Sequence, residues 1–175
     1  TTAKDTTGEP THFSLEDVTI NNGNFHYNEK LTPVNYSVKK FNFKSSGYYW
    51  DRDSIEAKFD FESGLGTGKM KGDFMINMEK LDYRLAAVMT KFDLKLIEQY
   101  MKDFSNYGSL RATIDADIKA RGNFNDAQNV EAKGFLAIND FHLSKYKGED
   151  YAAFKKLAIN VIRLNPKEKK YSIDS

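Results

Sequence analysis

Apolar and polar residues alternate along most of the chain with a period of two. The clearest segments are residues 55–62, 69–79, 81–89, 110–121 and 130–138. Successive side chains of a β-strand point to opposite faces of its sheet, so this alternation predicts strands with one apolar and one polar face. Strands of this kind are typical of an antiparallel sheet that meets water on one side.

Weaker strand patterns precede these segments. Residues 15–20 and 24–28 flank the sequence Asn21-Asn22-Gly23, whose Asn-Gly pair favours the positive φ of a hairpin turn. Within residues 36–44 the apolar positions change phase, which predicts a β-bulge near Lys39-Lys40.

One segment has helical spacing instead. Its apolar residues are Leu94, Ile97, Tyr100, Met101 and Phe104. This spacing predicts one helix over about residues 93–105, with Asp93 as its N-cap and residues 106–108 as its end.

The predicted strands are too long and too numerous for one helix to cover. Strands of ten to thirteen residues are about 35–40 Å long, and seven of them make an apolar face of more than about 1,000 Å². A helix of three turns covers an area of about 18 Å by 10 Å, and soluble monomers seldom expose apolar patches above about 300–600 Å². The sheet must therefore curl on itself, pair with another domain, or hold an apolar ligand. The fold expected is mainly β (α+β): a long, antiparallel, strongly curled sheet that forms a groove or half-barrel, with one short helix.

The chain of 175 residues fits one domain, or two very small ones. Residues 1–10 are polar and are expected to form a flexible lead-in, and residues 11–175 a single domain. The chain begins without Met or an apolar signal segment, and it ends within an alternating pattern at residues 171–175. We expect it to be a piece of a longer protein, truncated at both ends.

The amino-acid composition excludes or disfavours several classes of partner and site. Lys and Arg total 26 against 25 Asp and Glu, so the formal net charge is +1 and nothing favours a nucleic-acid partner. The absence of cysteine excludes thiol catalysis, disulfides and cysteine-ligated metals. His12, His26 and His142 lack partners at metal-ligand spacing, so neither a metal site nor a cofactor is predicted.

No enzyme motif is complete. Residues 64–70 (GLGTGKM) resemble a phosphate-binding loop, but Ser63 and Met70 stand where that motif requires Gly and a hydroxyl residue. A glycine-rich hairpin connection is the preferred interpretation. No GxSxG sequence is present, and the carboxylates alternate with Lys and Arg on the polar faces of strands. The chain is predicted not to be an enzyme.

Several segments resemble AsmA-like and TamB-like domains. They are LEDVTINNGNFHY (residues 15–27), FDLKLIEQY (92–100), GSL (108–110), GN (122–123), GFL (134–136) and DFHL (140–143). The resemblance extends over most of residues 13–175. It implies an envelope protein of Gram-negative bacteria on the periplasmic side, anchored in the inner membrane by a helix outside this chain. It also implies a β-groove, continued by further repeats, that conducts phospholipid acyl chains or supports outer-membrane biogenesis without catalysis.

The residues predicted to contact acyl chains are the large apolar ones of the alternating segments. They are Ile55, Phe59, Phe61, Phe74, Ile76, Leu85, Ile114, Ile118, Leu136 and Ile138. The alternative is a structural or protein-interaction module whose sheet is filled by its own side chains.

On the two predicted strands after the helix, small residues occupy several positions of the apolar face. They are Ala112, Ala116, Ala120, Ala132 and Gly134. They either make room for the helix, which is the preferred interpretation, or widen a groove for an acyl chain.

Overall fold

The computed structural model describes residues 14–29, 34–49, 52–104, 108–145 and 149–174 of the chain. Its elements are β1 (Leu15–Glu16), β2 (Thr19–Glu29), β3 (Val34–Ser45), β4 (Gly47–Tyr48), β5 (Ser54–Ser63), β6 (Lys69–Asn77), β7 (Asp82–Asp93), α1 (Lys95–Phe104), β8 (Ser109–Asn123), β9 (Asp126–Ser144), β10 (Asp150–Asn165) and β11 (Lys170–Asp174). The expected mainly β fold with one short helix is confirmed. The expected lead-in at residues 1–10 lies outside the described residues.

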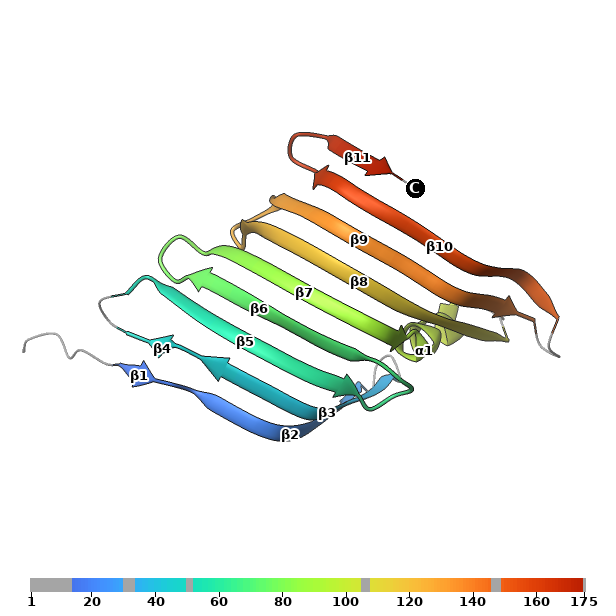
Figure 1. Ribbon diagram of the computed structural model, residues 1–175, viewed down its shortest axis with the longest axis horizontal. Coiled ribbons are helices and arrows are strands. Elements are labelled where there is room, and N and C mark those ends of the chain that lie inside the picture. The colour runs from blue at the N-terminus through green and yellow to red at the C-terminus, as the bar shows by residue number, and fades with distance from the viewer. Residues whose placement is uncertain (1–13, 30–33, 50–51, 105–107, 146–148, 175) are drawn as a thin grey trace, which may run out of the picture.

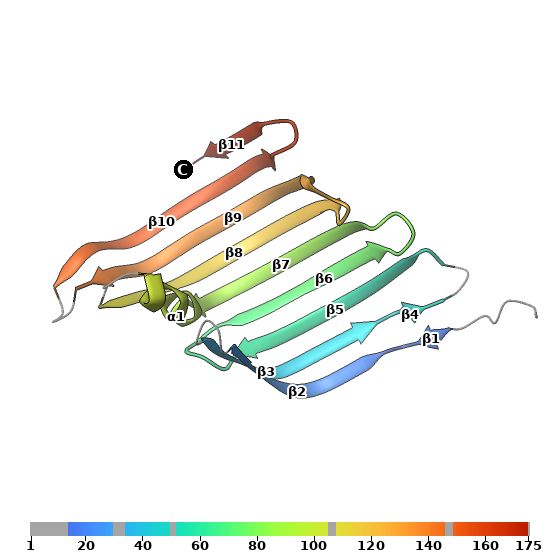
Figure 2. The same ribbon diagram turned by 180° about the vertical axis from the view of Figure 1, so that it is seen from behind.

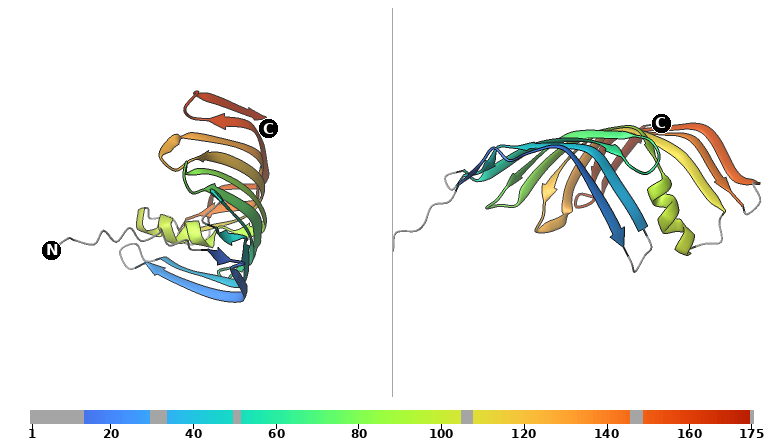
Figure 3. Two further views of the ribbon diagram at one scale, coloured as in Figure 1. Left: turned by 90° about the vertical axis from the view of Figure 1, so that its left-hand side faces the viewer. Right: turned by 90° about the horizontal axis from the view of Figure 1, so that it is seen from below.

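Nine strands form one antiparallel sheet in the order β11-β10-β9-β8-β7-β6-β5-β3-β2, and β1 pairs with β4 beside it (Figure 1). The view from behind shows the same uninterrupted array (Figure 2). The edge strands β2 and β11 do not pair with each other, so the sheet is open. The sheet is arched, and α1 lies on the inner side of the arch (Figure 3).

Register places the alternating residues on two distinct faces. The apolar face is defined by the row Ile20, Phe43, Phe59, Gly72, Ala87, Ile118, Gly134, Val161 and Ile173, which crosses all nine strands, and by the residues of the same orientation above and below it. The polar face is defined by the row Lys44, Lys58, Asp73, Ala86, Lys119 and Lys133. Because each strand follows the same two-residue period, the faces stay separate across the sheet.

The helix covers one end of the apolar face. Leu94, which joins β7 to α1, is buried against Leu110 and Ala112 of β8. The backbone N–H of Lys95 donates to Asp93 Oδ1 at 2.9 Å, which confirms Asp93 as the N-cap. On its other side α1 meets β3, where the Gln99 amide exchanges two hydrogen bonds with the backbone of Asn35, of 2.7 and 3.0 Å.

Three predictions about turns and bulges can be compared with the structure, and two of them are confirmed. The bulge predicted near Lys39-Lys40 is confirmed, since Lys40 has φ +51° and the β3–β5 register shifts there. The hairpin predicted at Asn21-Asn22-Gly23 is wrong, because β2 runs through it and absorbs Asn22, at φ +53°, as an irregularity. The glycine-rich segment 64–68 is a hairpin connection between β5 and β6, as expected.

Candidate functional site

All ten residues predicted to contact acyl chains lie on the apolar face. Direct cross-strand pairs join them to one another or to other apolar residues of that face. The pairs are Ile55 with Ile76, Phe61 with Met70, Phe74 with Leu85, Ile118 with Ala87, Ile114 with Ile138, and Leu136 with Ala116, and Phe59 faces Gly72. The structure thus brings predicted residues from five strands together into one continuous surface.

This face is largely uncovered. Each of the ten residues is half-buried, and among the described residues the only large apolar side chains that are buried are Leu94 and Leu110, both at the helix. The chain exposes 12788 Å², whereas about 8,700 Å² is expected for a compact monomer of 20.1 kDa. A single open sheet layer with one helix on it contributes to this larger surface.

No charged residue occurs in the two central rows of the apolar face. One is the row that defines the face, and the other contains Phe61, Met70, Met89, Ala116, Leu136 and Ile159. A continuous apolar surface of this kind binds apolar groups by excluding water and offers no group for acid–base chemistry.

A chain of phenylalanine rings occupies the β2–β7 side of the apolar face. Phe41 lies 5.2 Å from Phe25 in an edge-to-face arrangement, and Phe61 lies 6.4 Å from both Phe59 and Phe92. Sequence reasoning found Phe59 and Phe61 but missed Phe41 and Phe92. Bulges at Lys40 and Lys91, both at positive φ, shift the phase of the strands just before these residues.

The small residues on β8 and β9 have different roles. Ala112 makes room for the helix segment, as expected, because it is part of the buried cluster with Leu94. Gly134 is required by the sheet itself, since it has φ +144° and a Cβ there would lie 2.0 Å from the Asp117 carbonyl oxygen. Ala116, Ala120 and Ala132 lie outside the cluster at the helix.

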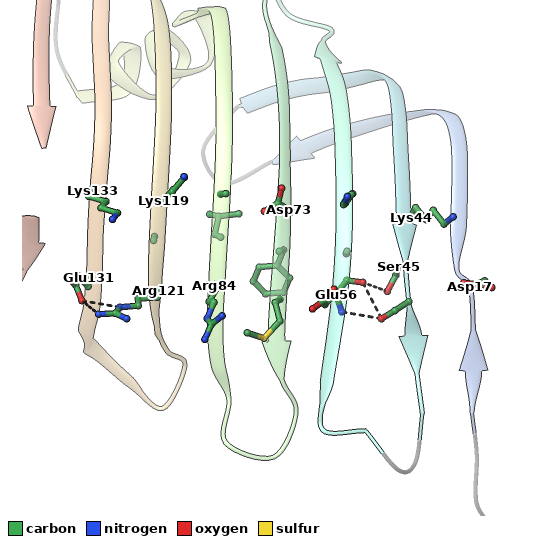
Figure 4. Close-up of a pocket in the computed structure, with 18 residues that line it drawn as sticks. Asp17, Lys44, Ser45, Glu56, Asp73, Arg84, Lys119, Arg121, Glu131 and Lys133 are labelled. Carbon is green, nitrogen blue, oxygen red and sulfur yellow. Dashed lines mark hydrogen bonds and ion pairs between the residues drawn. The ribbon is translucent and has the colours of Figure 1, made fainter. Parts of the chain in front are cut away.

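A hollow of about 1110 Å³ is lined mainly by residues of the polar face (Figure 4). Its lining includes Lys44, Lys58, Asp73, Arg84, Lys119, Arg121, Glu131 and Lys133. Phe74 and Leu85, two of the predicted residues with apolar-face orientation, also border it. Sequence reasoning did not anticipate this hollow, because its members converge only through strand register.

Ion pairs order one margin of the polar face. Glu131 pairs with Arg121 of β8 and lies 3.3 Å from Arg163 Nε of β10, and Arg163 also reaches Glu168 at 3.2 Å. The hydrogen bond from Arg121 lowers the pKa of the Glu131 carboxyl below its ordinary value. Because these groups are exposed or only half-buried, each pair contributes little to stability individually.

Ser144, Asp150 and His142 meet where β9 and β10 pair. Ser144 Oγ donates to Asp150 Oδ1 at 2.6 Å, and His142 Nδ1 lies 2.9 Å from Asp150 Oδ2. These hydrogen bonds, that of Ser144 foremost, lower the pKa of Asp150. The serine hydroxyl is directed to the carboxylate and not to the imidazole, so the nucleophile–base contact of hydrolases is not formed.

Metal-binding clusters and membrane-spanning helices are both absent from the described part of the chain. It contains no group of three His, Asp or Glu residues that could hold a metal ion. Its single helix is too short and too polar to cross a membrane.

No protein-family model, curated protein or solved structure matches the chain.

Proposed function

We propose that this chain is a non-catalytic β-groove module that binds phospholipid acyl chains along its apolar face. The observation that carries the proposal is the continuous apolar surface of nine strands, which one helix covers at one end only. In keeping with the resemblance to AsmA-like proteins, the module belongs to a periplasmic protein anchored in the inner membrane and conducts phospholipid between membranes or supports outer-membrane biogenesis. Further repeats of the same kind would extend the groove.

The position of α1 supports a concave groove. The helix contacts β3 and β8, between which β5, β6 and β7 intervene. In a flat sheet these two strands would be about 19 Å apart, roughly twice the diameter of a helix at about 10–12 Å. Contact of one helix with both strands supports a sheet that bends toward α1, with the apolar face on the inner side of the bend (Figure 3).

The dimensions suit acyl chains. Strands β8 and β9 have 15 and 19 residues, so they extend about 50–60 Å. The hydrocarbon core of one leaflet is about 15 Å thick, and the face can therefore hold several acyl chains end to end. Binding would remove from water the half-buried residues that the fold leaves uncovered.

The alternative, a structural module with a self-filled β core, is less well supported. Such a core buries large side chains from facing strands, whereas the large apolar residues buried in the described chain are Leu94 and Leu110. Both lie at the helix, away from the centre of the sheet.

Two adjacent residues of β9 test the proposal. Leu136 lies on the apolar face opposite Ala116, and Phe135 lies on the polar face opposite Asp117. We expect Leu136→Asn to weaken the binding of a fluorescent phospholipid to the purified chain by about tenfold, because it removes one buried apolar contact worth about 1.5–3 kcal/mol. Phe135→Asn, the matched control, should change the dissociation constant by less than about twofold.

The result is read by fluorescence titration, with circular dichroism to show that both variants are folded. Absence of phospholipid binding by the unmodified chain would contradict the proposal. Equal losses in the two variants would also contradict it, since they would show that binding does not depend on the apolar face.

A further inference from the structure

The charges of the polar face are not arranged evenly. Across most of the described sheet, directly opposed charged residues have opposite signs. These pairs are Lys39 with Glu62, Lys58 with Asp73, Asp60 with Lys71, Glu62 with Lys69, and Arg121 with Glu131. Opposite charges across a strand pair stabilise a sheet, and like charges destabilise it.

Three pairs break this pattern, and all three are cationic. They are Lys44 with Lys58, Arg84 with Arg121, and Lys119 with Lys133. All six residues line the hollow over the polar face. The like-charged pairs of the described sheet are therefore concentrated at a single place.

The cations are densest on β7, β8 and β9. Arg84, Lys119, Arg121 and Lys133 lie on these three adjacent strands in two neighbouring rows, within about 10 Å across the strands and about 7 Å along them. The carboxylate among them is Glu131, which is shared between Arg121 and Arg163. Figure 4 shows these side chains side by side on the same strands.

Three of the four cations lack an ion-pair partner among the described residues. Arg84, Lys119 and Lys133 are exposed and form no ion pair with another described residue. Ala86 stands directly opposite Lys119 and two residues from Arg84, and its small side chain leaves space between them. The other carboxylates that line the hollow, Asp17, Glu56 and Asp73, come from the β1–β6 side.

We propose that the β7–β9 part of this hollow binds a compact, soluble anion that carries phosphate groups, of the size of a diphosphate. Two guanidinium groups and two ammonium groups match the charge and the multiple oxygen acceptors of such an anion. A polymeric polyanion would need a longer cationic track, but Asp73 interrupts the row beyond Ala86. The cations line a hollow, which favours a discrete molecule over a flat membrane surface.

This site is independent of the lipid proposal, because its four cations lie on the opposite face of the sheet from the residues predicted to contact acyl chains. Its test is calorimetric titration of the chain with pyrophosphate at low ionic strength, where surface charges are least screened. We expect a dissociation constant below about 1 mM for the unmodified chain, and Lys119→Gln should raise it by about fivefold or more. The matched control is Lys71→Gln, on the same face but opposed by Asp60 and outside the hollow, and it should leave the constant unchanged within about twofold.

Melting temperatures show whether the variants are folded. Pyrophosphate should raise the melting temperature of the unmodified chain and of Lys71→Gln, because a ligand that binds only the folded state stabilises it. Lys119→Gln without ligand should melt no lower than the unmodified chain, since it relieves the repulsion from Lys133.

Three results would overturn the proposal. The first is no binding of pyrophosphate at about 10 mM, a concentration that detects even weak sites. The second is an equal loss in the two variants, which would show a general charge effect. The third is binding to phosphatidylglycerol vesicles without binding to pyrophosphate, which would assign these cations to a membrane surface.

Discussion

We expect Gly134→Ala to lower the free energy of unfolding of the chain by about 3 kcal/mol or more. Gly134 has φ +144°, a conformation that residues with a side chain rarely adopt. An added Cβ would lie 2.0 Å from the Asp117 carbonyl oxygen and 2.9 Å from the Ile118 Cα. Both atoms belong to the backbone of β8, so neither can move aside without separating two central strands.

Urea denaturation followed by circular dichroism measures this effect, and Gly23→Ala is its control. A Cβ at Gly23 would meet ring and methyl atoms of Phe25 and Ile20 at 3.0–3.4 Å, which can rotate away, and Gly23 is not at positive φ. Its cost should be below about 1 kcal/mol. Equal stabilities of the Gly134→Ala variant and the unmodified chain would show that β8 and β9 do not approach as closely as described.

The second large effect is expected at the helix. Leu110→Ala should lower the free energy of unfolding by about 3 kcal/mol, since removing a buried leucine side chain loses its transfer free energy and leaves a cavity. Leu110 is 5 % exposed and packs against Leu94 and Ala112. These contacts hold α1 on the sheet, so the variant should also lose helical signal in the circular dichroism spectrum.

Leu157→Ala is the matched control for this prediction. Leu157 lies on the apolar face opposite Ile138 but is 42 % exposed, so its loss should cost less than about 1 kcal/mol in the absence of ligand. A cost at Leu157 as large as that at Leu110 would mean that the apolar face is covered in solution, which would contradict the proposed function.

Much of the sheet follows from the sequence because a period of two is a strong constraint. One residue of slippage would move a whole apolar set into water. The ten predicted residues therefore share a face even though they lie on five separate strands, from Ile55 on β5 to Ile138 on β9. Helix α1 was equally predictable, since Asp93 caps an apolar spacing of three and four.

What sequence reasoning missed depends on bulges and register. The bulge at Lys40 was predicted from the change of phase, but the one at Lys91 was not. Lys91 adopts positive φ, which the identity of a lysine does not predict, and it changes the face of the residues that follow. Asp140, also at positive φ, lets β9 continue to Ser144, beyond the alternating segment 130–138 that the sequence shows.

The cationic hollow could not be predicted from the sequence for a related reason. Lys119 and Lys133 are fourteen positions apart, and each on its own looks like a solvated lysine on a polar face. Only the β8–β9 register places them directly opposite each other. Alternation predicts which face a residue occupies but not which residue it opposes.

The central claim, that the apolar face carries lipid, is tested most directly by site-specific photo-crosslinking inside cells. Ile118 is suited to this purpose because it faces Gly134 near the middle of the sheet, whereas Ile114 packs against the cluster at α1. A photoreactive residue at Ile118, and separately at its polar-face neighbour Asp117, is introduced into the protein in a Gram-negative host, and adducts are identified by mass spectrometry. The account predicts phospholipid adducts at position 118 and none at position 117. A folded protein with no phospholipid at position 118, or with equal amounts at both positions, would contradict it.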